Sequence, residues 1–234
     1  MPLVESVPVP PPVQARSVAV DGVADAASDA AANEPLVILD GVGHAFNAAT
    51  RLFRGLTITL LPRHVYALVG PSGSGKSTLL SIIAGWERPS EGTVTRERVR
   101  KVSWVFQNPH GVARRTALDH VALPYLAQGY APDEAERLAM EQMDVFGLHD
   151  LARRRFQELS GGEAQRLMLA RGVATCADLL LVDEPTAQLD VHTADTVNAR
   201  LGALSRDGMI VVIATHDHRT RDAATDVIDL EDYQ

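Results

Sequence analysis

One short stretch of the chain carries residue types that could bind a phosphate group. It is rich in glycine, it ends in a lysine and two hydroxyl residues, and its members are Gly70, Pro71, Ser72, Gly73, Ser74, Gly75, Lys76, Ser77 and Thr78. Glycines let a backbone turn tightly and bring several N–H groups to one anion. Lys76 could reach the outer phosphates of a nucleotide, and the Ser77 hydroxyl could ligate magnesium. The spacing fits the phosphate-binding pattern G-x-x-x-x-G-K-[ST].

The residues on either side of this stretch favour a strand before it and a helix after it. Residues 65–69 are apolar and rich in strand formers, whereas residues 76–84 have a helical pattern that Gly85 could end. A helix N-terminus would add partial positive charge where the loop gathers its N–H groups. An ordinary glycine and serine turn before a helix is the alternative, and this strand–loop–helix context disfavours it.

Two adjacent carboxylates follow a second apolar run. Residues 179–182 predict a buried strand, and Asp183 and Glu184 come directly after it. Ligands bind at the carboxyl ends of strands in open α/β sheets. Asp183 is suited to hold magnesium, directly or through water, and Glu184 is suited to orient and deprotonate an attacking water. Paired carboxylates after a strand are common by chance, but the phosphate-binding loop in the same chain favours the functional interpretation.

A second predicted helix also begins with residues suited to an anion. Residues 159–163 read Leu-Ser-Gly-Gly-Glu, so a hydroxyl and two glycines stand at a helix start. One nucleotide seldom needs two such helix starts from one chain.

Together these motifs resemble those of ATP-binding cassette (ABC) ATPases, the nucleotide-binding subunits of ABC transporters. The resemblance covers about residues 36–230 and includes the Walker A loop at 70–77, the signature at 159–163 and the Walker B strand ending at Asp183 and Glu184. Three further matches, in the order typical of the family, are Gln107, Asp190 and His216.

The resemblance implies roles for these further residues. Gln107 would contact the magnesium or the attacking water and sense the membrane partner, Asp190 would lie across a dimer interface, and His216 would contact the γ-phosphate. Phe46 would stack on adenine, where the family often has tyrosine. Taken alone, a histidine at a strand end is usually a structural polar residue, and a lone aromatic usually belongs to the core.

The resemblance also implies cofactors and partners. MgATP would lie between the Walker A loop of one subunit and the signature residues of the other, which here are Ser160, Gly161 and Gly162. The dimer would be a homodimer or a pair with another ABC subunit. Hydrolysis would drive a separate integral membrane permease, which would hold the chain on the cytoplasmic face of the cell membrane.

One segment points to a subfamily. Residues 116–124 resemble the lipoprotein-release, macrolide-export and cell-division group, but His120 stands where asparagine is usual. Arg63 and His64 also replace the Gly-Glu pair common before the Walker A strand, and Asn108 and Pro109 are closer to other importers and exporters.

Strand patterns that alternate with helical patterns predict a mainly parallel α/β sheet. The resemblance implies a RecA-like P-loop NTPase fold with an antiparallel β edge. We expect a disordered Pro- and Ala-rich tail over 1–34, an ATPase domain over 35–234, and an inserted helical subdomain over about 109–158. The expected strands are 36–39, 56–60, 65–69, 92–95, 102–106, 179–182 and 209–213. The expected helices are 76–84, one that begins near Thr116 with a capping box between Thr116 and Asp119, 132–146, one from 161, and 191–204.

Composition narrows the classes of function. The 234 residues carry a formal net charge of −8, which argues against a general nucleic-acid or membrane-surface binder. The single cysteine, Cys176, allows no internal disulfide, and no run has the roughly 18–20 apolar residues needed to span a bilayer. Two alternatives to a transport ATPase are a nucleotide-gated protein that regulates a membrane partner, and an ABC ATPase of DNA repair or translation, which would usually carry two cassettes or long insertions.

Overall fold

A computed structural model describes residues 34–47, 50–204 and 208–234. A compact unit spans Pro35–Gln234, and the description below concerns this unit. The tail predicted for 1–34 lies outside the described residues, apart from Glu34. Within the described ranges, no helix is long and apolar enough to cross a membrane.

The centre of the unit is a five-stranded sheet in which all pairings are parallel. Its strands, in spatial order, are β5 (Val102–Val105), β6 (Leu179–Asp183), β7 (Ile210–Ala214), β3 (Val65–Val69) and β8 (Asp226–Asp229). All residues of β6 and β7 are buried, as expected for apolar strands covered on both faces. The parallel order brings the carboxyl ends of β3, β6 and β7 to one edge, where the phosphate-binding loop and the paired carboxylates follow.

A second, three-stranded sheet is antiparallel, with β1 (Leu36–Asn47) between β2 (Thr50–Leu60) and β4 (Glu91–Glu97). The strands predicted at 36–39 and 56–60 were too short. The β1–β2 ladder continues through several register irregularities, so the chain stays paired where the local apolar alternation breaks down.

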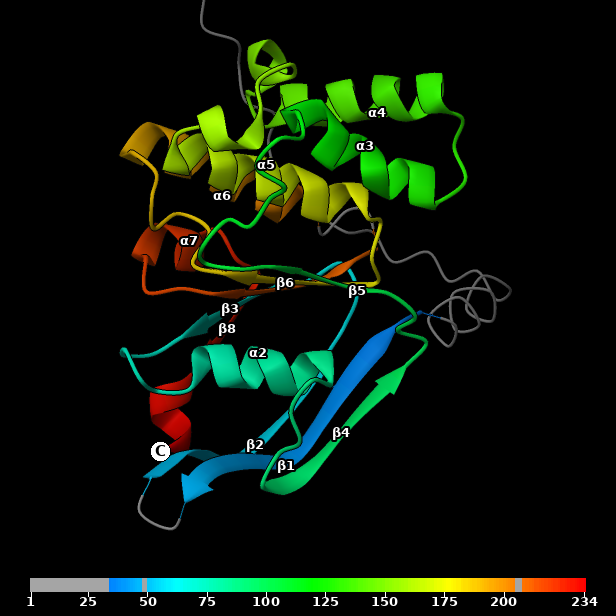
Figure 1. The fold of residues 1–234 in the computed structure, drawn as a ribbon. Coiled ribbons are helices and arrows are strands. Elements are labelled where there is room, and N and C mark those ends of the chain that lie inside the picture. The colour runs from blue at the N-terminus through cyan, green and yellow to red at the C-terminus, as the bar shows by residue number, and fades with distance from the viewer. Residues whose placement is uncertain (1–33, 48–49, 205–207) are drawn as a thin grey trace, which may run out of the picture. The chain divides into compact units, whose positions relative to one another are not determined.

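Helices cover both faces of the parallel sheet (Figure 1). α2 (Lys76–Ala84) lies between the two sheets. The opposite face is covered by α5 (Gly161–Ala174) and α6 (Val191–Ala203), with α3 (Ala117–Ala127) and α4 (Pro132–Val145) beyond them. The remaining short elements are α7 (His218–Asp222) and the 3-10 turns η1 (His149–Leu151), η2 (Phe156–Glu158) and η4 (Leu230–Tyr233).

Local sequence explains where several helices begin. Thr116 accepts a hydrogen bond from the Asp119 N–H at 3.1 Å, and Asp119 accepts one from the Thr116 N–H at 2.9 Å. This reciprocal capping box starts α3 as predicted. Pro132 opens α4, where its missing N–H costs nothing. The inserted segment therefore contributes two helices, and its first residues, 109–116, form a loop.

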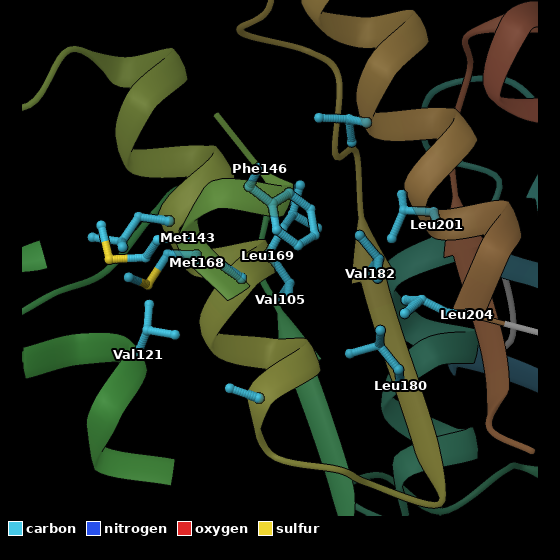
Figure 2. Close-up of a cluster of buried hydrophobic side chains, with 14 of the residues drawn as sticks. Val105, Val121, Met143, Phe146, Met168, Leu169, Leu180, Val182, Leu201 and Leu204 are labelled. Carbon is cyan, nitrogen blue, oxygen red and sulfur yellow. The ribbon is translucent and has the colours of Figure 1, made fainter. Parts of the chain in front are cut away.

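The parallel sheet separates two hydrophobic clusters. Leu180 and Val182 of β6 point into the cluster formed with α3, α4, α5 and α6 (Figure 2). Leu179 and Leu181 of the same strand point into the cluster formed with α2 and the antiparallel sheet. Alternation along one strand thus fixes the layers on both faces of the sheet.

Candidate active site

The phosphate-binding loop depends on glycine at three positions. Gly70, Gly73 and Gly75 have φ values of 140°, 84° and 99°, a region that L side chains rarely adopt. A Cβ at Gly75 would also lie 3.0 Å from the Leu52 side chain. Gly75 is the N-cap of α2 and makes no side-chain cap, so the first N–H groups of this helix are directed toward the loop.

Lys76 spans the loop that precedes it. Its Nζ donates hydrogen bonds to the carbonyl oxygens of Gly70 at 2.8 Å and Pro71 at 3.1 Å. The side chain is half-buried, so the ammonium is held over the loop. A phosphate group bound to the loop would therefore meet a positive charge that is already positioned.

The Walker A loop and the strand β6 are joined by a hydrogen bond between side chains. Ser77 Oγ donates to Asp183 Oδ2 at 2.7 Å. Burial raises the pKa of the Asp183 carboxyl; the nearby Glu184 carboxylate also raises it, while the Ser77 hydrogen bond and the Lys76 charge oppose the rise. A cation bound between Ser77 and Asp183 would relieve the cost of this buried charge.

Glu184 is the first residue after β6 and is held in an unusual conformation. Its φ is 48°, and its N–H donates to the Ala214 carbonyl at 2.9 Å. The Glu184 side chain is buried, whereas that of His216 is 71% exposed. His216 contacts both carboxylate oxygens, because its Nδ1 lies 2.9 Å from Oε1 and its backbone N–H donates to Oε2 at 3.4 Å.

These groups surround one cavity of about 480 Å³. Every residue that lines it was predicted from the sequence, and the lining consists of Ser72, Gly73, Lys76, Ser77, Gln107, Asp183, Glu184 and His216. The Ser77 hydroxyl, the Asp183 carboxylate and the Gln107 amide oxygen are hard oxygen ligands. Magnesium prefers such ligands and usually completes its coordination with water and substrate phosphates, so this donor set fits the ion.

The predicted nucleotide-binding residues from other parts of the chain lie outside the lining of this cavity, as do Gly70, Pro71, Ser74, Gly75 and Thr78 of the loop itself. Those from other parts of the chain are Phe46, Ser160, Gly161, Gly162 and Asp190. Ser160 is the N-cap of α5, where it forms a capping box with Glu163. The Ser160 N–H donates to Glu163 at 2.8 Å, and this bond lowers the pKa of the Glu163 carboxyl.

The signature glycines pack against the residues that precede Asp190. A Cβ at Gly161 would lie 2.6 Å from Gln188 Oε1, and one at Gly162 would lie 3.2 Å from the Gln188 carbonyl oxygen. Asp190 caps α6 by accepting from the Thr193 N–H at 3.1 Å, and the Thr193 hydrogen bonds lower its pKa. Gln188 was not among the predicted residues, although it stands only two residues before the predicted Asp190.

Phe46 near the end of β1 is 63% exposed. The His44 ring contacts it edge-on, with centroids 5.2 Å apart. Most of the Phe46 side chain is therefore accessible, although Phe46 does not belong to the lining of the phosphate-binding cavity.

Comparison with known proteins places these features in a family. Residues 53–187 match the family model described as ABC transporter. The chain is 36% identical over 218 residues to the lipoprotein-releasing system ATP-binding protein LolD of Anaeromyxobacter dehalogenans, covering 85% of this chain and 91% of LolD. It is 35% identical to the cell division ATP-binding protein FtsE of Escherichia coli, covering 78% of this chain and 88% of FtsE.

Other relatives are longer, and solved structures share the fold. The macrolide export ATP-binding/permease protein MacB of Azoarcus sp. is 31% identical, and the match covers 88% of this chain but only 34% of MacB. The ATP-binding cassette MJ0796, solved as a dimer in a post-hydrolysis state bound to ADP and Pi, matches with a TM-score of 0.74 and 28% identity over 82% of this chain and 93% of that one.

Proposed function

Because this chain belongs to the ABC transporter family, we propose that it is the ATPase subunit of an ABC transporter. It binds MgATP, dimerises and hydrolyses ATP to power an integral membrane permease. The observation that carries the proposal is the single cavity that gathers a phosphate-binding lysine, a candidate magnesium pair and a candidate base, namely Lys76, Ser77, Asp183 and Glu184. Catalysis of phosphoryl transfer depends mostly on positioning and on electrostatic stabilisation, and these residues supply both.

Each residue has a separate task in this mechanism. The loop N–H groups and Lys76 bind the β- and γ-phosphates. Glu184 accepts a proton from the attacking water at a carboxylate oxygen that His216 keeps oriented. His216 is exposed toward the cavity and supports the charge on the γ-phosphate. Ser77, Asp183 and Gln107 would hold magnesium, which would neutralise charge on the transferring phosphate.

The complete site requires a second subunit. Ser160, Gly161 and Gly162 present a helix N-terminus outside the cavity, so in the proposal they serve the nucleotide of the partner subunit. The dimeric state of the MJ0796 cassette supports this arrangement. Asp190 packs beside the same glycines through Gln188 and would lie at the same interface.

The membrane partner is proposed from the relatives. LolD is named the ATP-binding protein of a lipoprotein-releasing system, whereas MacB is named an ATP-binding/permease protein, of which the match covers 34%. The permease is therefore proposed to be a separate chain that holds this subunit on the cytoplasmic face of the membrane. FtsE supports an alternative, a nucleotide-gated regulator of a membrane partner.

One experiment tests the proposal and separates these alternatives. The full chain is purified with the membrane protein that co-purifies with it and is reconstituted in vesicles. The transport proposal expects phosphate release that depends on Mg²⁺ and movement of a solute that depends on ATP. Nucleotide binding without coupled movement would favour the regulator. Absence of both binding and hydrolysis would contradict both.

A further inference from the structure

We propose that His120 is a positioning residue that fastens the loop following Gln107 to helix α3. The loop consists of residues 108–116 and runs from the cavity to the start of the helical subdomain. Its importance for catalysis rests on the function proposed above, since Gln107 lines the cavity. The hydrogen bonds of His120 are observed independently of that proposed function.

The partners of His120 fix the protonation of its ring. Nδ1 lies 2.7 Å from the carbonyl oxygen of Thr116, which can only accept, so Nδ1 carries a proton. Nε2 accepts the Val112 N–H at 2.9 Å, so Nε2 carries none. His120 is therefore the neutral Nδ1–H tautomer, and it joins a backbone donor of the loop to the first turn of α3. The ring is only 5% exposed, so water does not readily replace either bond.

The same loop also packs against Phe156, whose ring neighbours that of His120. The His120 and Phe156 rings lie 5.3 Å apart between centroids. A Cβ at Gly111 would fall 2.4 Å from an atom of the Phe156 ring, so the loop backbone passes directly against that ring. The imidazole and the phenyl ring thus hold adjacent residues of the loop, Gly111 and Val112.

Backbone hydrogen bonds join this region to the segment that leads to Ser160. They run from the Phe156 N–H to the Arg115 carbonyl, from Gln157 to Ala113, from Ala117 to Arg154 and from Leu118 to Ala152, at 2.8–3.2 Å. Ser160 follows the η2 turn that Phe156 opens. The loop that follows Gln107 is therefore connected by hydrogen bonds to the segment that precedes the signature. The bond from the Val112 N–H to the His120 side chain is part of that connection.

Isosteric variants separate the two bonds of His120. In His120→Gln the amide oxygen can take the place of Nε2 and still accept from Val112. In His120→Asn the shorter amide can reach only the Thr116 carbonyl. His120→Phe keeps a ring against Phe156 and loses both bonds. His149→Gln is the control, because His149 lies in η1 of the same subdomain with 61% of its side chain exposed.

The variants are compared in the full chain by hydrogen exchange at the Val112 amide and by steady-state ATP hydrolysis. Loss of a buried hydrogen bond should speed exchange at Val112 by about tenfold in His120→Asn and His120→Phe. The same two variants should lower kcat by about threefold to tenfold and leave KM for MgATP within about twofold, because Gln107 is misplaced while the phosphate-binding loop is intact. His120→Gln and His149→Gln should stay close to wild type in both measurements.

Several outcomes would overturn the proposal. Equal behaviour of His120→Gln and His120→Asn would show that the Val112 bond is not the positioning element. A changed melting temperature with unchanged exchange and kcat would show a purely structural role. If wild-type protein hydrolyses no ATP, the proposed function fails, yet the exchange at Val112 still decides whether His120 holds the loop. His120→Phe decides the question if His120→Asn does not fold.

Discussion

His216 Nδ1 lies 2.9 Å from Glu184 Oε1, although 32 residues separate the two in the chain. The contact exists because β6 and β7 are neighbouring parallel strands, with Asp183 of β6 in register with Ala214 of β7. Glu184 leaves one strand end and His216 leaves the next. The carboxylate is thereby oriented by a residue that its own strand could not provide.

Replacing Glu184 with glutamine keeps the shape of this contact and removes the base. We expect turnover to fall by at least about 100-fold, because general-base catalysis typically contributes that much. ATP should still bind, and the ATP-bound dimer should live longer. Phosphate release and light scattering in saturating MgATP measure both effects. Glu136→Gln, on the exposed side of α4, is the control, and near-normal turnover in Glu184→Gln would remove the base assignment.

Replacing Lys76 with alanine should weaken ATP binding by about tenfold or more, since a charge-assisted contact to phosphate is lost. Turnover should be abolished. Equilibrium binding of a fluorescent ATP analogue and phosphate release are the measurements. Lys101→Ala is the matched control, because Lys101 is exposed and its Nζ donates to the Thr175 carbonyl at 2.8 Å. Equal losses in the two variants would argue against a specific phosphate contact.

Asp183→Asn should stabilise the nucleotide-free protein near pH 7. Burial raises the pKa of Asp183 in the folded state, so the folded protein binds more protons than the unfolded chain between the two pKa values. Ionisation therefore opposes folding, and stability declines as pH rises through that interval. The free energy of unfolding of the variant should exceed that of the wild type by about 1 kcal/mol at neutral pH. ATP hydrolysis by the variant should fall.

Thermal unfolding of Asp183→Asn and wild type, in EDTA and without nucleotide, measures this gain at several pH values. The difference should shrink as the pH falls and should stop changing below the ordinary pKa of 3.8, where the Asp183 carboxyl is protonated in both the folded and the unfolded wild-type chain. A variant that is less stable than wild type at pH 7, or a difference that does not change with pH, would contradict the prediction.

Ser160→Arg should permit ATP binding but block closure of the dimer, because an arginine adds bulk where two subunits would meet. Ser160→Ala is the matched control, since both changes remove the same helix cap, at a cost of about 1 kcal/mol. Only the arginine should prevent dimer formation in MgATP. Similar dimerisation of the two variants would indicate that Ser160 does not lie at the interface.

Mixing Ser160→Arg with Lys76→Ala tests whether Ser160 acts on the partner's nucleotide. A mixed dimer would have one site with both changes and one site with neither. Phosphate release should partly recover in the mixture, although each variant alone lacks it. Heterodimers that form without recovery would mean that both sites must act together or that Ser160 does not act across the interface. Hydrolysis by isolated Ser160→Arg monomers would exclude a site that is completed by the partner subunit.

The sequence predicted the fold class and the family correctly because the informative residues act locally. Periodicity and Gly85 together gave the bounds of α2, and the reciprocal bonds of Thr116 and Asp119 followed from their spacing. Most of the lining of the cavity could be predicted for the same reason, since the phosphate-binding loop and the carboxylates stand at strand ends, whereas Gln107 and His216 were predicted from the family resemblance. The functional roles of these residues remain predictions.

Features that depend on distant partners were missed. α7 and β8 are short, and β8 is a strand only because it pairs with β3. Its residues 226–229 read Asp-Val-Ile-Asp, and two apolar residues between aspartates give little local signal. His120 was recognised as a departure from the family pattern, but its partner Val112 is defined by the loop geometry. Spacing in the sequence does not reveal that bond.

The division of β6 between two hydrophobic clusters has a consequence for how the unit unfolds. Leu180 and Val182 belong to one cluster, and Leu179 and Leu181 to the other, so separating β6 from its neighbours exposes both cores at once. Neither layer of helices can therefore melt while the other keeps its packing. Spectroscopic probes placed on α2 and on α5 should report the same denaturant midpoint, as a cooperative two-state transition requires.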